Sequence, residues 1–229
     1  MRIILVTYLI LITSVTKGQV KIITPGEHLG FELETFDRQS QRLKTTISQG
    51  ETWTAVYTSK GAFTTKVEKL LWDTTRNFTI LSDNTNQPNF YFQGLKNHVS
   101  IGEGTAFDWN DFRTLKPLVW TLNKTSYTIL YQNDPTCREL TAFQYKIIDT
   151  DSDFVLFKGV TQEQMDKLQI TEENRVLLYW TGDLNGDNEP DFLLGLKSHH
   201  EMPIIELIMS SKKNRKIKWI RIARFTTWG

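Results

Sequence analysis

The chain has one cysteine, Cys137, and six prolines among its 229 residues. A single cysteine excludes an intrachain disulfide, so core burial, with a bound metal as a further contribution, must hold the fold together. No Cys/His signature surrounds Cys137, and we interpret this thiol as incidental rather than nucleophilic. No proline- or serine-rich linker divides the chain, which favours one continuous folded unit.

Neither sign of charge is in excess, because 27 Lys and Arg residues are balanced by 26 Asp and Glu. This balance gives no electrostatic case for nucleic-acid binding. The local exception is residues 212–218, Lys-Lys-Asn-Arg-Lys-Ile-Lys, in which five of seven residues are basic. A solvated turn between two strands explains this run, and a surface for an anionic partner is the alternative.

Long apolar runs are also missing beyond the N-terminus. Residues 1–18 begin with Met1-Arg2, continue with an apolar stretch through Ile12 and end with Thr16-Lys-Gly18. A basic start, an apolar stretch and small residues before a cleavage point predict a signal peptide. The apolar stretch is short for a transmembrane span, and no second run of about 20 apolar residues follows. We expect an exported protein, periplasmic or secreted, with no transmembrane segment after maturation.

The remaining chain is punctuated by turn-forming residues at the spacing of a β-meander. The spacing predicts strands in many segments, with a β-bulge near Arg221 in the last one. Thr161-Gln-Glu-Gln164 resembles a capping box and predicts a short helix through about Leu168. The predicted fold is mainly β, with antiparallel sheets in a sandwich- or barrel-like arrangement and one short helix. An N-terminal β region (19–120) would pack on a C-terminal β region (121–229).

The signal weakens between Leu95 and Pro117, which predicts a long loop. This stretch holds Glu103, Asp108 and Asp111 together with Trp109. A pair of carboxylates brought together by folding can hydrolyse a glycosidic bond, and an exposed Trp suits sugar binding. A Trp is more often part of the core. A hydrolase acting on cell-wall or glycan substrates is therefore the alternative function that the sequence leaves open.

The strongest chemical pattern is the loop Asp183-Leu-Asn-Gly-Asp-Asn-Glu-Pro-Asp191. Calcium takes six to eight oxygen ligands, and an EF-hand-type loop supplies them from positions 1, 3, 5, 7 and 9. The corresponding candidate ligands are the side chains of Asp183, Asn185 and Asp187, the main-chain oxygen of Glu189, and Asp191 directly or through water. The sequence therefore predicts a Ca²⁺ site, and the alternative is a polar Asx-rich turn whose carboxylates only accept backbone hydrogen bonds.

The loop departs from an EF-hand in three ways. Position 12 is Leu194, so the bidentate Glu that closes an EF-hand is missing. Position 6 is Asn188 instead of Gly, and Asn is the next most tolerant residue for a left-handed backbone. The flanking segments, 177–180 and 192–194, have the pattern of strands rather than helices. These departures predict a structural site that pins a β-hairpin, and not a calcium switch.

The segment Trp180-Thr-Gly-Asp-Leu-Asn-Gly-Asp-Asn-Glu-Pro-Asp-Phe192 resembles the calcium loops of integrin-α-like FG-GAP repeats. The loop occurs once, whereas a propeller repeats it in each blade. The segment is more closely similar to a group of uncharacterised exported Gram-negative bacterial proteins, in which a single loop of this kind is followed by a strand and a Ser-Ser dipeptide, here Ser210-Ser211. This resemblance covers about the last 140 residues and implies export and a cation loop.

No other catalytic set is recognisable in the sequence. His199-His200-Glu201 is the one cluster with metal or acid–base potential, but neighbouring side chains on a strand point to opposite faces. There is no Gly-x-Ser-x-Gly elbow and no glycine-rich phosphate loop. We expect a non-enzymatic calcium-binding protein that binds another macromolecule, with an immunity protein against a secreted bacterial toxin as the specific form suggested by analogy.

Overall fold

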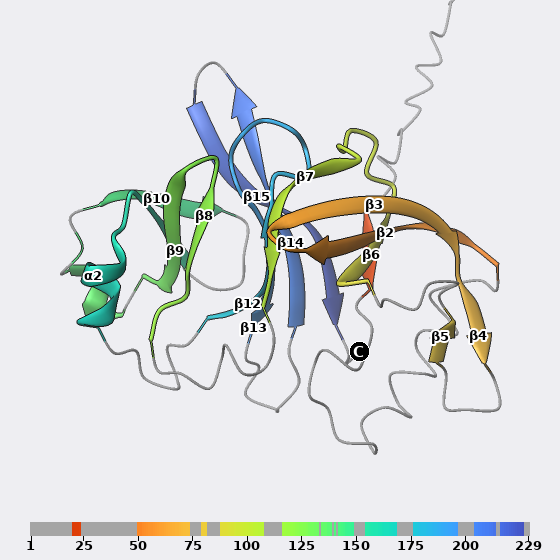
Figure 1. Ribbon diagram of the computed structural model, residues 1–229, viewed down its shortest axis with the longest axis horizontal. Coiled ribbons are helices and arrows are strands. Elements are labelled where there is room, and N and C mark those ends of the chain that lie inside the picture. Colours follow the sequence, from red (N-terminus) through yellow and green to blue (C-terminus); the bar gives the residue numbers. More distant parts are fainter. Residues whose placement is uncertain are drawn as a thin grey trace, which may run out of the picture.

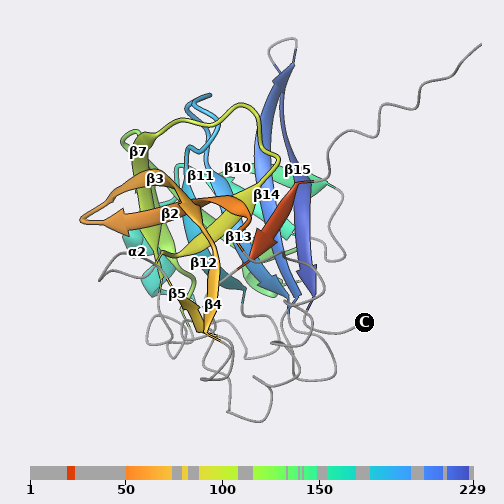
Figure 2. The same cartoon turned by 90° about the vertical axis from the view of Figure 1, so that its right-hand side faces the viewer.

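A computed structural model describes residues 20–23, 50–73, 79–81, 88–107, 116–132, 134–138, 140, 142–148, 154–168, 176–196, 204–213 and 216–226. Figures 1 and 2 show a curled sheet with one short helix on its outer side. The predicted signal peptide, residues 1–18, lies outside the described residues. None of the helices in the described ranges is long and apolar enough to cross a membrane.

Thirteen strands form one sheet in the order β1-β6-β2-β3-β7-β12-β13-β14-β15-β10-β11-β9-β8, and β4 and β5 form a separate pair. All pairings are antiparallel except β10 with β15. The elements are β1 (Lys21–Ile23), β2 (Thr52–Ser59), β3 (Ala62–Lys69), β4 (Leu71–Asp73), β5 (Thr79–Leu81), β6 (Phe90–Gln93), β7 (Ile101–Ala106), β8 (Val119–Leu122), β9 (Thr125–Tyr131), η3 (Pro135–Arg138), β10 (Phe143–Ile148), β11 (Phe154–Lys158), α2 (Gln162–Asp166), β12 (Leu177–Gly182), β13 (Asp191–Leu196), β14 (Ile204–Lys213) and β15 (Lys216–Thr226).

The sheet curls so that its two outer parts return toward the middle. At one end β1 lies against β15, and at the other end β8 lies against β7. The two curled parts share the strands β7, β12, β13, β14 and β15, seen in Figure 1 as the blue and yellow-green strands at the centre. The fold is thus mainly antiparallel β and barrel-like, as the sequence predicts.

The central strands β12, β13 and β14 are buried on both faces. Leu193 of β13 packs in a core with Phe63, Phe90 and Trp180, while its neighbours Phe192 and Leu194 pack on the other face. The second core also contains Trp120, Tyr127, Ile208 and Trp219. Alternating strand residues point to opposite faces, so an apolar run such as Leu177–Trp180 can fill both cores at once.

The short helix confirms the prediction made from the capping box. Thr161 Oγ1 accepts a hydrogen bond from Gln164 N, and Gln164 Oε1 accepts one from Thr161 N. The helix covers an outer apolar face of β9 and β11 through Met165, packed with Leu130 and Phe157. The β-bulge is confirmed as well, because Leu207 pairs with Ala223 and Ile208 with Arg221, leaving Ile222 as the extra residue.

The predicted long loop between Leu95 and Pro117 is wrong for its middle part. Residues 101–106 form β7, which pairs with β3 and β12 in the interior of the sheet. Gly102 and Gly104 hid this strand, because glycine is unfavourable in strands by propensity. Here glycine is required by packing, since a Cβ at Gly102 would lie 2.6 Å from Cε1 of Phe63.

Candidate metal centre in the β12–β13 loop

The loop that connects β12 to β13 carries all five predicted ligands, Asp183, Asn185, Asp187, Glu189 and Asp191. Its backbone turns through left-handed conformations at Gly186 (φ +76°) and Asn188 (φ +67°). The left-handed position predicted for Asn188 is therefore confirmed. These two turns direct successive main-chain nitrogens toward the inside of the loop.

Side-chain oxygens inside the loop accept those main-chain donors. Asp183 Oδ1 accepts from Asp187 N at 2.9 Å, and Asp183 Oδ2 accepts from Asn188 N at 2.8 Å. Asn185 Oδ1 accepts from Asp187 N at 3.0 Å, and Asp187 Oδ1 accepts from Glu189 N at 3.0 Å. Asp183 and Asn185 thus share the Asp187 N–H as a donor, and Asp187 accepts from the main chain two residues further on.

Asp191 occupies a different position at the start of β13, where its side chain is fully buried. Its Oδ2 accepts from Leu184 N at 2.7 Å and from Asn185 N at 3.2 Å. Its Oδ1 accepts from Ser210 N at 2.8 Å and from Ser210 Oγ at 3.0 Å. Three main-chain donors, and the Ser210 hydroxyl proton that Asp191 shares with Asp187, occupy most of the acceptor directions of this carboxylate, so its contact with an ion would be indirect.

The Asp187 carboxylate has hydrogen-bond donors, among the described residues, on one of its two oxygens. Its Oδ1 accepts from Glu189 N and from Ser210 Oγ, the latter at 2.9 Å. Its Oδ2 is buried and has no hydrogen-bond partner among the described residues. A buried carboxylate oxygen without a partner costs about 1–3 kcal/mol or more, so this atom is the natural first ligand of a cation.

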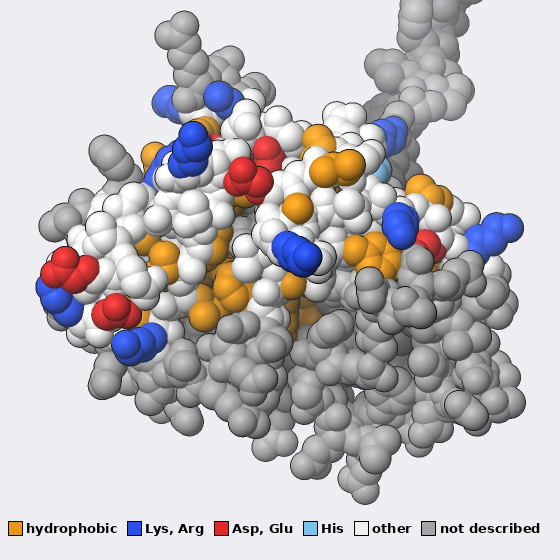
Figure 3. Space-filling model, in the orientation of Figure 1, with side chains coloured by type: hydrophobic (Ala, Val, Ile, Leu, Met, Phe, Trp, Pro, Cys, Tyr) orange, Lys and Arg blue, Asp and Glu red, His pale blue; other side chains and the backbone are white. Residues whose placement is uncertain are grey.

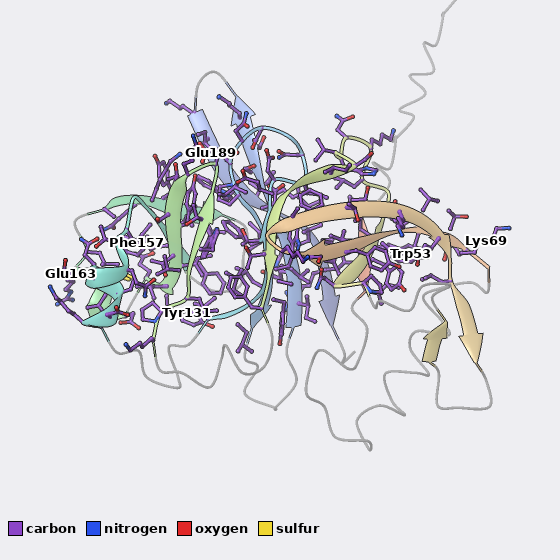
Figure 4. The ribbon with its side chains drawn as sticks, in the orientation of Figure 1. Trp53, Lys69, Tyr131, Phe157, Glu163 and Glu189 are labelled. Carbon is purple, nitrogen blue, oxygen red and sulfur yellow. The ribbon has the colours of Figure 1, made fainter. Side chains whose placement is uncertain are left out.

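The side chain of Glu189 points away from the loop toward β9 and β11 of the same sheet. Figure 4 shows it at the upper end of β8 and β9. Its carboxylate pairs with Lys158 Nζ at 2.9 and 3.1 Å, and the Tyr127 hydroxyl donates to it at 3.5 Å. Burial opposes the charged form of Lys158, but its hydrogen bonds with Glu189, together with the charges of Tyr127 and Glu189, raise the pKa of Lys158. The Glu189 side chain is thus used structurally, which leaves its main-chain oxygen as the candidate ligand.

Four further segments hold the loop in place. Val99 N donates to Leu184 O at 2.8 Å, and the Leu184 side chain is buried in the first core. The indole nitrogen of Trp219 on β15 donates to Pro190 O at 2.7 Å. Asn185 Nδ2 donates to Ser210 O at 2.8 Å, and Asn123 Nδ2 approaches Asn188 O at 3.5 Å. A loop fixed from so many directions is preorganised for a ligand.

Burial disfavours the charged forms of two loop carboxyl groups, those of Asp183 and Asp191. Burial raises the pKa of Asp183 despite hydrogen bonds from Asn188 and Asp187, and the charge of Asp187 adds to the rise. Burial also holds the pKa of Asp191 well above its ordinary value, against the hydrogen bonds from Ser210. A divalent cation among these carboxylates would relieve both effects, because it favours their charged forms.

Three or more His, Cys, Asp or Glu side chains do not converge on a common metal position anywhere in the described part of the chain. The loop differs from such a cluster, since two of its proposed ligands are an amide oxygen, from Asn185, and a main-chain oxygen, from Glu189. Oxygen sets of this kind are typical of hard cations such as Ca²⁺ and are unlike zinc sites.

Of the other candidate catalytic residues from the sequence, Glu103 is the one that lies among the described residues, and its main-chain oxygen accepts from Asp183 N at 3.4 Å. Glu103 lies on β7, and its Oε2 accepts from Asn123 N at 2.7 Å, which is a structural contact. His98 packs edge-on against Phe92 at 5.0 Å. Asp108, Trp109, Asp111 and the His199-His200-Glu201 cluster lie outside the described residues.

Residues that sequence reasoning missed surround the loop from distant strands. Ser210 donates to one oxygen of Asp187 and to one oxygen of Asp191. Trp219 donates to Pro190 O, and Lys158 pairs with the Glu189 side chain. The one sequence signal for Ser210 is the Ser210-Ser211 dipeptide after the loop, which is part of the resemblance to exported bacterial proteins. No pattern links Lys158 or Trp219 to a loop more than twenty residues away.

The chain matches no protein family model, and neither a curated protein nor a solved structure matches it. The fold and the site together define a mainly antiparallel β protein with a preorganised acidic loop between two central strands.

Proposed function

We propose that this chain is an exported, non-enzymatic β protein that binds Ca²⁺ in the loop Asp183–Asp191 and binds another macromolecule through its surface. The observation that carries the calcium assignment is the buried Oδ2 of Asp187, which has no hydrogen-bond partner in the described part of the structure. The pattern of loop ligands and the left-handed turns at Gly186 and Asn188 support the same assignment.

The proposed ligands are the side-chain oxygens of Asp183, Asn185 and Asp187 and the main-chain oxygen of Glu189. Asp191 belongs to the site through its hydrogen bonds to Leu184 N and Asn185 N, which orient the loop. When bound, the ion supplies positive charge that offsets the buried carboxylates. Since the loop joins two strands of the central sheet and is held by β14 and β15, the role of the ion is to stabilise the fold.

Two exposed apolar side chains support a macromolecular partner. Val67 on β3 is 72% exposed, and Ile101 on the adjoining strand β7 is 71% exposed. By strand register Ile101 shares its face of the sheet with Thr64, whereas Val67, three residues further along β3, lies on the other face. The two side chains thus offer a partner one exposed apolar contact on each face of this part of the sheet. In this proposal the protein acts in the periplasm or outside the cell, and an immunity protein that neutralises a secreted bacterial toxin is the specific form that fits.

Calcium titration into chelator-treated protein tests the site. A site with a dissociation constant of about 0.1–1 mM, filled at about 10 mM Ca²⁺, should stabilise the native state by about 1.4–2.7 kcal/mol. The melting temperature should rise by several degrees, and the double substitution Asp183→Ala and Asp187→Ala should remove that rise. An unchanged response of the double variant would refute the assignment.

The partner is tested separately, by pull-down from periplasmic extract in calcium. Wild-type protein should retain a defined partner, and the double substitution Val67→Asp and Ile101→Asp should lose it without a change in melting temperature. A matched control is Ser59→Asp with Thr121→Asp, which adds the same two negative charges at exposed positions on other strands. Recovery of no stable partner with the wild-type protein would overturn this part of the proposal.

A further inference from the structure

The end of the β14–β15 hairpin is the one strongly basic region of a chain whose net charge is +1. From Leu207 to Gly229 there are seven basic residues and no acidic residue. Five of the seven fall between positions 212 and 218, and Figure 3 shows Lys and Arg side chains gathered at this upper end of β14 and β15. The positive charge is therefore concentrated on one projecting element.

The end of the hairpin projects because β14 and β15 extend beyond the residues that pair with β13 and β10. β13 pairs with β14 only from Ile204 to Ile208, and β10 pairs with β15 only at Trp219 and Ile220. Beyond these residues the two strands pair with each other alone, as far as Lys213 opposite Lys216. Figures 1 and 2 show this two-stranded end standing above the sheet.

Three exposed lysines mark the described part of this hairpin end. Lys212, Lys216 and Lys218 are exposed, and they take part in none of the ion pairs between described residues. Lys213 and Lys216 stand directly opposite each other, a like-charge pairing that destabilises a sheet. The ion pairs between described residues thus leave the positive charge of this end without neutralisation, so it can attract an anionic partner.

We infer that the basic hairpin end, defined by Lys212, Lys216 and Lys218, binds an anionic phospholipid surface. Protein interfaces are depleted in lysine and depend on aromatic or Arg anchors in a desolvated centre. The hairpin end offers lysines on both strands and no exposed aromatic residue among those described. Delocalised positive charge of this kind fits a surface of many headgroups, where each Lys adds attraction without needing a shaped pocket.

A nucleic acid fits the remaining observations less well. The other exposed lysines are scattered, and the whole chain is nearly neutral, whereas nucleic-acid binding requires basic residues along an extended track. The only apolar residue between 211 and 218 is Ile217, which is half-buried, so the contact is electrostatic and does not insert side chains into the bilayer.

The base of the hairpin is rigid enough to present these charges. Ser210, two residues before Lys212, donates to Asp191 and Asp187, and Trp219, next to Lys218, donates to Pro190 O. The lysines therefore start from strand positions that are fixed by the loop. Preorganised charges lose less conformational entropy on binding than the same residues on a flexible tail.

The test is sedimentation of the full chain with vesicles of phosphatidylcholine containing about 30% phosphatidylglycerol, compared with pure phosphatidylcholine, in about 0.1 M NaCl. Wild-type protein should bind only the anionic vesicles and should be released by high salt. The triple substitution of Lys212, Lys216 and Lys218 to Gln should weaken binding about 100-fold, from about fivefold for each lysine.

The matched control removes the same charge elsewhere, by Lys60→Gln, Lys69→Gln and Lys96→Gln. These lysines are exposed and lie away from the hairpin, and Figure 4 shows Lys69 at the far end of β3. The control should bind within about threefold of wild type. An equal loss in both triple variants, or no binding of wild type to anionic vesicles, would overturn the inference.

Tighter binding of a DNA duplex or of polyglutamate than of anionic vesicles, at equal concentration of negative charge, would also overturn it and assign the hairpin to another polyanion. The triple Lys→Gln variant should keep or slightly raise the wild-type melting temperature, because it removes like charges that face each other. The vesicle test does not require calcium, so it can succeed or fail independently of the proposed site.

Discussion

Ser210 on β14 donates two hydrogen bonds to the same oxygen of Asp191, from its main-chain nitrogen at 2.8 Å and from its hydroxyl at 3.0 Å. The hydroxyl oxygen also lies 2.9 Å from Asp187 Oδ1 and accepts from Asn185 Nδ2 at 3.2 Å. Ser210 thus contacts Asp191, Asp187 and Asn185. The neighbouring strand is in this way part of the proposed site.

Ser210→Ala should lower the free energy of unfolding by about 1–3 kcal/mol, because buried oxygens of Asp187 and Asp191 lose a donor. It should also weaken the calcium-dependent rise in melting temperature. Urea unfolding in calcium and in chelator measures both effects. Ser211→Ala, at the exposed neighbouring position, is the control and should change neither.

Asp187→Asn should have opposite effects with and without calcium. In chelator the substitution removes the negative charge of a carboxylate whose Oδ2 is buried with no partner among the described residues, so the variant should be more stable than wild type by about 1 kcal/mol. In saturating calcium the variant should be less stable than wild type, since an amide is a weaker ligand. Thermal unfolding in both buffers checks this crossing, and a variant destabilised equally in both would contradict it.

The ion pair between Lys158 and Glu189 should stabilise the folded state. A double-mutant cycle with Lys158→Gln and Glu189→Gln should give a coupling energy of about 1 kcal/mol at pH 7, as expected for a half-buried pair. Chemical unfolding of the four proteins provides the measurement, and strict additivity would show that the pair is not coupled.

The pH dependence of that coupling has a definite sign. The pKa of Lys158 is raised above its ordinary value of 10.5 in the folded state. The contribution of the pair should therefore be complete below pH 10.5 and be lost as the pH rises through the folded pKa. Repeating the cycle at pH values from 8 to about 11 tests this, and a coupling that declined already near pH 8 would contradict the assignment.

Gly102→Ala should destabilise the protein by about 1–3 kcal/mol through overpacking, because the new Cβ would lie 2.6 Å from Cε1 of Phe63. The second change Phe63→Leu should recover part of this loss, since the smaller side chain removes the clash. Urea unfolding of the single and double variants measures the recovery. If the losses of stability from Gly102→Ala and Phe63→Leu simply add in the double variant, the Phe63 ring is not the reason for a glycine at position 102.

Cys137 should react slowly in the native protein. Its thiol donates to Tyr131 O at 3.1 Å, and burial raises the pKa of Cys137 to about 11, with Asp134 adding to the rise. About one thiol in a thousand is then ionised at pH 8, and the thiolate is the reactive form. Iodoacetamide labelling followed by mass spectrometry should be slow until denaturant is added, and rapid native labelling would contradict this picture.

Several parts of the fold could be predicted from local sequence because local interactions form them. The capping box at Thr161 and Gln164 closes within three residues, and it predicted α2 correctly. The left-handed turn at Asn188 follows from the chemistry of one residue. β7 was missed because its glycines are explained only by Phe63, which lies on another strand.

The sequence by itself determined a mainly β chain and the single acidic loop with its order of candidate ligands, since strand periodicity and loop spacing are short-range properties. Only the tertiary structure decided which oxygens are already used. It supplies Asp191 with main-chain donors from the loop and from Ser210. It directs the Glu189 side chain to Lys158 and leaves Asp187 Oδ2 buried with no hydrogen-bond partner among the described residues. These outcomes depend on donors from β11 and β14, and sheet pairing brings such distant segments together in a register that no local pattern records.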